Sequence, residues 1–203
     1  MKSVLISIKP KYCELIANGK KTVEVRKTKP KIDVPFKCYI YCTYGEGLIE
    51  FNDEMLPNHL IEYKVSKDKI WGNCCNGKVI GEFVCDTIHE FTKAFFDEQE
   101  PQDTEEIGFW LDQFELSYNE LCSYVGTKDF YGWHISNLVI YDKPKELREF
   151  EPVCKYNMDC ECVYWDECKH KAITTDWGYV ANMCNKKITR PPQSWCYVEE
   201  LGV

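Results

Sequence analysis

Gly19-Lys-Lys-Thr-Val-Glu-Val-Arg26 is the stretch of this sequence that most restricts the fold. Before it, residues 11–18 carry apolar side chains at helical spacing, and the leading glycine suits the left-handed position that closes a helix. After the two lysines, residues 22–26 alternate strictly, which predicts a strand with Val23 and Val25 on one face. The stretch therefore predicts a helix, a glycine stop and a strand in direct succession.

The elements outward from this stretch are mostly strands, expected at residues 4–8, 36–44, 78–85 and 132–141. Ser117-Tyr-Asn-Glu120 is a capping box, which predicts a short helix through Tyr124. The connecting segments are a loop-rich stretch at 45–76 and an acidic, aromatic insertion at 91–111. This order predicts an α+β fold, a small and mostly antiparallel β-barrel, closed or nearly closed, with short helices at its ends.

Length and composition are those of a globular chain with one main domain. The 203 residues are 44% hydrophobic with a mean hydropathy of -0.43, and the apolar runs are too short to span a membrane. The first residues lack the pattern of a secretory signal. We expect a cytoplasmic protein without a membrane partner, in which residues 1–148 form the domain and residues 149–203 an extension packing back on it.

Charge is distributed unevenly along the chain. The net charge of -8 argues against a protein that coats nucleic acid through bulk electrostatics. Residues 1–32 nevertheless hold nine basic side chains against Glu14 and Glu24, whereas residues 97–120 are strongly acidic. The pattern predicts a dipolar molecule, and the alternative is two solvated faces without a specific role.

The residues around the opening stretch have the chemistry of a nucleotide site. A lysine, a carboxylate and a guanidinium on one rim can hold a phosphate and accept from the exocyclic amine of a base. The alternative is a surface ion pair between Glu24 and Arg26, which would contribute little. The candidate ligand-binding residues here are Lys9, Lys20, Lys21, Thr22, Glu24 and Arg26.

Aromatic side chains offer a second part of such a site. Tyr131 and Trp133 flank Gly132 at the entrance of an expected strand, where they would form a platform on which a base stacks. The alternative for Trp133 is a place in the core. His134 alternates to the opposite face, and a structural role is expected for it.

Several of these motifs together resemble the ASCH domain. They are Ile6-Ser-Ile-Lys-Pro10, the helix, the opening stretch, Gly77-Lys-Val-Ile-Gly-Glu82 and Tyr131-Gly-Trp-His-Ile-Ser136. The resemblance covers roughly residues 1–148 and implies a PUA-like β-barrel related to domains that bind RNA. The tail resembles an extension of some bacterial and phage members, which end in a similar Pro191-Pro-Gln-Ser-Trp195 stretch. The resemblance to this family implies an RNA or a modified nucleoside or nucleotide as the ligand.

Two branches of that family imply hydrolase alternatives. One resembles amidohydrolases acting on acylated cytidine, which use a lysine, a threonine three residues later and a distant glutamate. Lys21 matches the lysine, but Glu24 stands in place of the threonine nucleophile, so Lys21 and Glu24 would have to act as an acid–base pair. Glu90 and Glu115 are both conceivable as the glutamate. The other branch resembles ribonucleases that use lysine, tyrosine and serine, for which the sequence offers Tyr44, Tyr131 and Ser136. A third alternative is a protein-interaction or regulatory module that uses the acidic face.

Cysteines crowd into the last part of the chain. Six of the thirteen lie within residues 154–196, together with His170. In a reducing cytosol such a cluster favours a structural metal over disulfides, and zinc is the default for thiolates. An iron–sulfur cluster and a tail of packed, reduced cysteines are the alternatives. The predicted zinc ligands are Cys160, Cys162, Cys168 and Cys184, with Cys154, His170 and Cys196 as substitutes.

Overall fold

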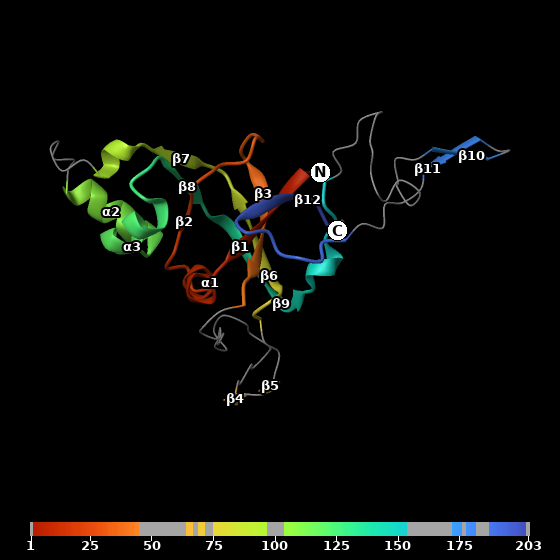
Figure 1. Cartoon of the computed structure of the whole chain (residues 1–203), viewed down its shortest axis with the longest axis horizontal. Helices are drawn as coiled ribbons and strands as arrows, with labels where there is room; N and C mark the ends of the chain where they lie inside the picture. The colour runs from red at the N-terminus through yellow and green to blue at the C-terminus, as the bar shows by residue number, and fades with distance from the viewer. Residues whose placement is uncertain are drawn as a thin grey trace.

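A computed structural model describes residues 2–44, 64–66, 69–71, 75–96, 104–153, 172–175, 178–181 and 187–201. Its largest sheet has five strands in the order β12-β1-β3-β6-β9 (Figure 1). β1 and β3 are parallel, and the other neighbours are antiparallel. The strands are β1 (Lys2–Ile8), β3 (Phe36–Cys42), β6 (Val79–Cys85), β9 (Ser136–Lys145) and β12 (Trp195–Glu199).

A second sheet has three antiparallel strands in the order β2-β8-β7. They are β2 (Val23–Arg26), β8 (Phe130–His134) and β7 (Ile88–Phe91). The chain passes almost directly from β6 to β7 and from β8 to β9, so the two sheets are joined by bends. Two short hairpins complete the described strands, β4 (Lys64–Ser66) with β5 (Lys69–Trp71) and β10 (Ala172–Thr175) with β11 (Gly178–Ala181).

The predicted α+β class with mostly antiparallel strands is confirmed, and one detail differs from the expectation. Among the described residues, the strands of the expected barrel pair as a five-stranded and a three-stranded sheet. The single strand expected at 132–141 is two strands, β8 and β9, because the chain turns at Ile135 and Asn137 takes a left-handed φ of 47°. That turn carries the chain from one sheet into the other.

Helices cover the sheets where the local signals place them. They are α1 (Pro10–Ala17), α2 (Thr104–Phe114) and α3 (Tyr118–Val125), with 3-10 turns η1 (Lys93–Phe96) and η2 (Leu147–Glu149). Gly19 takes a φ of +73° after α1, as the glycine stop predicts. The Ser117 side chain accepts from the Glu120 N–H and the Glu120 side chain accepts from the Ser117 N–H, so the capping box is confirmed.

Three apolar clusters form the core of the described structure. One fills the space between the five-stranded sheet, α1 and Trp133 of the smaller sheet. A second lies on the other face of the five-stranded sheet, where Leu147 and Phe150 pack. The third joins the smaller sheet to α2 and α3, which lie together at one end of the molecule (Figure 1). Since both of its faces are covered, every residue of β2 is buried.

The end of the expected extension forms part of the main sheet. β12 pairs with β1 from Lys2↔Glu199 to Ile6↔Trp195, and the Glu199 N–H donates to the Glu151 carbonyl oxygen at 2.9 Å. The strand that closes this edge is therefore supplied by residues 195–199. It brings the segment that precedes it next to β1.

Candidate ligand-binding site

Three charged side chains are buried where the first helix leads into β2. Only 3% of Lys21, 6% of Glu24 and 5% of Arg26 is exposed. The predicted alternation is confirmed, because Val23 and Val25 face the helices while Glu24 and Arg26 share the other face. The alternative of a surface ion pair does not hold, since Glu24 and Arg26 are both buried. Full burial of three charges is costly unless each is paired.

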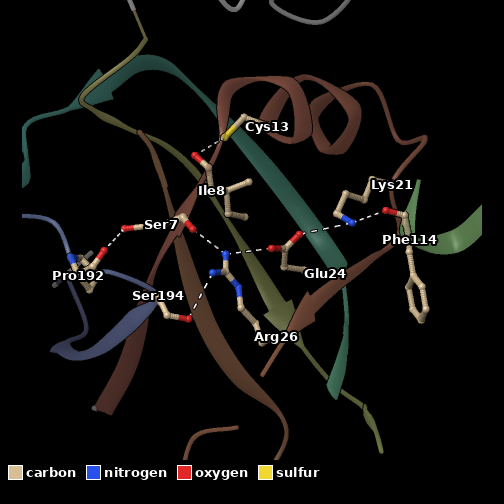
Figure 2. Close-up of polar contacts among 9 residues, drawn as sticks. All are labelled: Ser7, Ile8, Cys13, Lys21, Glu24, Arg26, Phe114, Pro192 and Ser194. Carbon is tan, nitrogen blue, oxygen red and sulfur yellow. Dashed lines mark hydrogen bonds and ion pairs between the residues drawn. The ribbon is translucent and has the colours of Figure 1, made fainter. Parts of the chain in front are cut away.

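One carboxylate lies between the two cations (Figure 2). Arg26 Nη2 lies 2.9 Å from Glu24 Oε1, and Lys21 Nζ lies 3.5 Å from Glu24 Oε2. Lys21 also donates to the Phe114 carbonyl oxygen at the end of α2. The cluster of Lys21, Glu24 and Arg26 therefore has a net charge of +1 in its fully ionised form and holds α2 against β2.

The guanidinium of Arg26 also binds the chain that leads into β12. Nη2 donates to the Ser7 carbonyl oxygen at 2.6 Å, and Nη1 donates to Ser194 Oγ at 3.3 Å. Ser7 in turn donates through its hydroxyl to the Pro192 carbonyl oxygen at 2.7 Å and through its N–H to the Ser194 carbonyl oxygen at 2.9 Å (Figure 2). The Pro-Pro-Gln-Ser-Trp stretch thus forms one wall of the cluster.

Burial changes the acid–base properties of the cluster. It lowers the pKa of the Lys21 ammonium, and the neighbouring Glu24 carboxylate opposes this. Arg26 Nε is buried without a hydrogen-bond partner among the described residues, although its two other nitrogens are bound. A free, buried guanidinium donor and an excess of positive charge both favour an anionic or acceptor group as a ligand.

Two tyrosines at this site were not anticipated from the sequence. The ring of Tyr12 in α1 lies 5.3 Å from Lys21 Nζ. Tyr124, at the end of α3, is 39% exposed, and burial raises its pKa while the nearby Arg26 opposes this. In the sequence both tyrosines were only residues of short helices, and their convergence depends on how α1 and α3 pack. They give the cluster two aromatic neighbours.

The two aromatic residues predicted to bind a base, Trp133 and Tyr131, differ in their exposure. Trp133 is completely buried against Phe36 and Trp195, so the stacking surface expected there is wrong and the core alternative is confirmed. Tyr131 is half-buried with Lys29 Nζ 5.5 Å from its ring.

The remaining basic and hydroxyl candidates lie at the margin of the cluster. Lys9 and Lys20 are exposed at the two ends of α1, and within the described part of the chain neither side chain forms an ion pair. The hydroxyl of Thr22 donates to the Gln113 side chain, which links β2 to α2. His134 Nδ1 lies 2.6 Å from Asp86 in an exposed pair, as expected for a structural histidine.

The residues of the two hydrolase alternatives are only partly brought together, since Lys21 and Glu24 are in contact. Glu115 acts electrostatically on Lys21, whereas Glu90 pairs with Lys29 at the surface. For the ribonuclease alternative, Ser136 donates to the Val84 carbonyl oxygen and Tyr44 is 75% exposed. Those contacts join neither residue to Lys21.

The predicted zinc ligands Cys160, Cys162, Cys168 and Cys184 lie outside the described residues, as do Cys154 and His170. Cys196 is described and is half-buried in β12, where burial raises the pKa of its thiol to about 11. Within the described ranges, three or more potential metal ligands do not come together. The zinc site therefore stays a prediction.

The fold and the cluster define a small α+β domain with a cation-rich site where its two sheets meet. The family model described as the ASCH domain matches residues 6–109, which is just over half of the chain. The chain belongs to the ASCH domain family, whose members are related to RNA-binding domains. No curated protein matches the sequence.

Two solved structures from Zymomonas mobilis are similar to this chain. The ASCH protein of that organism is 16% identical, with 98% of this chain and 88% of that chain covered and a TM-score of 0.47. A point mutant of it is 18% identical, with 72% and 77% covered and the same TM-score of 0.47. In the described part of our chain, the helices are too short or too polar to cross a membrane.

Proposed function

We propose that the protein binds RNA or a modified nucleotide through the Lys21–Glu24–Arg26 cluster. The observation that supports this most is the burial of two cations around one carboxylate, where Arg26 Nε has no hydrogen-bond partner among the described residues. A phosphate would take up the excess positive charge. Glu24 has the chemistry to accept from an exocyclic amine, and Tyr12 and Tyr124 supply flat aromatic surfaces beside it. We also propose that the protein is cytoplasmic, where reducing conditions would keep the described cysteines as thiols rather than disulfides.

Thermal unfolding with cytidine and with cytidine monophosphate tests this proposal. A ligand at one hundred times its Kd adds about 2.7 kcal/mol to the free energy of unfolding, which raises the Tm by roughly 5–10 °C for a chain of this size. We expect the monophosphate to raise the Tm more than the nucleoside does. Equal effects of the two ligands would contradict a role for the cationic cluster in phosphate binding.

A charge-removing variant assigns the effect to the cluster. Arg26→Gln leaves Lys21 and Glu24 as a neutral pair, so it removes the net positive charge without leaving a buried charge alone. We expect at least a tenfold loss of monophosphate affinity in this variant. Lys37→Gln is the matched control, because Lys37 also forms ion pairs, with Glu82 at 3.0 Å and Glu200 at 3.3 Å, on another part of the sheet. Loss of affinity in both variants would argue against a specific site.

A hydrolase in the same site is the second candidate, and the lowered pKa of Lys21 favours it. A buried amine with a lowered pKa has a larger neutral fraction, which is the form that accepts a proton or attacks a carbonyl. Incubation with acylated cytidine and with short RNA would reveal turnover. We expect Lys21→Met to abolish it, while Lys37→Met, at a lysine that pairs with Glu82 and Glu200 instead, retains it. If ligands neither bind nor react, the protein-contact alternative takes precedence.

A further inference from the structure

Among the described residues, several tyrosine rings have a lysine ammonium over the ring, and three of them are those of Tyr124, Tyr131 and Tyr197. The distance from Nζ to ring centroid is 5.1 Å for Lys27 and Tyr124 and 5.5 Å for Lys29 and Tyr131. For the third pair, Lys2 and Tyr197, it is 3.8 Å. The lysines are exposed and the tyrosines are partly exposed. Exposed contacts of this kind are weak, so both partners can turn to a ligand.

These three pairs and Lys31 define the tyrosine–lysine strip, which consists of Lys2, Lys27, Lys29, Lys31, Tyr124, Tyr131 and Tyr197. The segment after Arg26 leads from β2 to β3, lies beside β12 on the way and carries three of its lysines. Trp195 Nε1 donates to Thr28 Oγ1 at 3.1 Å, and the Lys31 N–H donates to the Tyr197 hydroxyl at 2.6 Å. The strip therefore begins beside the buried cluster and continues over β12.

The strip is positive although the whole chain is acidic. The strip has four lysines. Two of them have a carboxylate nearby, since Glu90 pairs with Lys29 and Glu199 lies opposite Lys2 across the β1–β12 pair. Asp33, at the end of the same crossing segment, is exposed. The surplus positive charge adds to the +1 of the buried cluster. A polyanion that enters the cluster would thus meet further cations along this surface.

We propose that the tyrosine–lysine strip binds the nucleotides that flank the one held in the Lys21–Glu24–Arg26 cluster, so that the ligand is a single-stranded RNA. This rests on the proposed function and names its ligand class. Lysines spaced along a surface suit successive phosphates, and tyrosine rings stack on bases of any identity. A duplex hides its base faces in the helix stack, whereas a single strand exposes them.

Binding of a labelled twelve-nucleotide single-stranded RNA, measured by fluorescence anisotropy, tests the proposal. We expect the wild-type protein to have a higher affinity for this RNA than for cytidine monophosphate, which is added as an unlabelled competitor. Each lysine–phosphate contact on a single strand changes the salt slope by about 0.7, which corresponds to about fivefold in affinity at 0.1 M salt. The double variant Lys27→Gln/Lys29→Gln should therefore bind roughly 25-fold more weakly, with a salt slope shallower by roughly 1.4.

The matched control is Lys187→Gln, which removes another exposed lysine whose Nζ pairs with Glu151 at 2.9 Å. It should bind the RNA as the wild type does. The proposed role of the strip is contradicted if the double variant binds the RNA like this control, or if a duplex of the same length binds more tightly than the single strand. The proposed function survives those outcomes if Arg26→Gln still loses the mononucleotide. It fails, independently of the strip, if the wild type binds no nucleotide of any length.

Discussion

At the scale of single residues, Glu24 is the group on which the buried cluster depends. It is the carboxylate between Lys21 and Arg26, and both cations are almost completely buried. Water cannot solvate the two cations in place of Glu24, because only 3% of Lys21 and 5% of Arg26 is exposed. The Glu24 side chain therefore has a structural role as well as the proposed binding role.

Glu24→Gln tests the structural role. The substitution keeps the size of the side chain but leaves two buried cations without a counter-charge, and breaking a buried ion pair in this way costs roughly 3–5 kcal/mol. We expect a loss of that size in the free energy of unfolding, measured by urea denaturation. Glu90→Gln is the control, since it removes one partner of an exposed pair, and such pairs contribute about 0–1 kcal/mol. Similar effects of the two substitutions would contradict the buried cluster.

The shared face of Glu24 and Arg26 was predictable from the sequence, but its environment was not. Strict alternation in residues 22–26 placed Glu24 and Arg26 on one face, and this is what the structure has. Whether that face meets water depends on segments more than 80 residues away, which no local pattern reveals. The same reason explains Trp133, whose alternation was correct and whose exposure was not.

At the scale of elements, the sequence predicted correctly those features that depend only on neighbouring residues. The glycine stop after α1 and the capping box of α3 are both present. Elements that depend on distant partners were harder to predict from the sequence. The division of residues 130–145 into β8 and β9 follows from the way the two sheets meet, and the pairing of β12 with β1 joins the two ends of the described chain.

The capping box of α3 predicts a pH-dependent stability. Bonds from the Ser117 N–H and hydroxyl, and from Lys11, lower the pKa of Glu120 to about 2 from an ordinary value of 4.5. Because its folded pKa is the lower one, the contribution of Glu120 is fully present above pH 4.5 and is lost as the pH falls toward 2. Ser117→Ala should cost about 1 kcal/mol at pH 7 in urea denaturation.

The same variant should lose part of that difference from the wild type at pH 2.5, because the bond from the Ser117 hydroxyl to the Glu120 carboxylate weakens as Glu120 is protonated. The bond from the Glu120 N–H to Ser117 Oγ does not titrate, so its share of the cost should remain. Ser123→Ala, an exposed position within the same helix, is the control and should have little effect at either pH. A cost that stays constant from pH 7 to pH 2.5 would show that the Ser117 hydroxyl does not stabilise the Glu120 carboxylate.

At the scale of the whole molecule, the cysteines are divided between two settings. Those of the described sheets and helices are free, and most are buried, as expected for small apolar side chains. The cluster at Cys160, Cys162, Cys168 and Cys184 differs in its density, and we propose that it holds a structural zinc ion.

Elemental analysis of the purified protein checks the metal. We expect about one zinc per chain, because four thiolates satisfy one tetrahedral ion. Cys160→Ser/Cys162→Ser should lose the zinc, whereas Cys122→Ser, which replaces a half-buried cysteine of α3, should retain it. Iron with visible absorbance would indicate an iron–sulfur cluster instead, and absence of both metals would support reduced, packed thiols.

The pairing of β1 with β12 also affects how the chain folds while it is being made. Synthesis at about 5–20 residues per second takes roughly 10–40 s to cover the roughly 190 residues from Ile8 to Glu199. For that time β1 lacks the neighbour that later covers its outer edge, although six of its seven residues are buried in the final fold. An apolar strand with a free edge invites pairing with other chains. A nascent chain stalled before residue 190 should therefore depend on chaperones, and Arg26 in it would still lack the hydroxyl of Ser194.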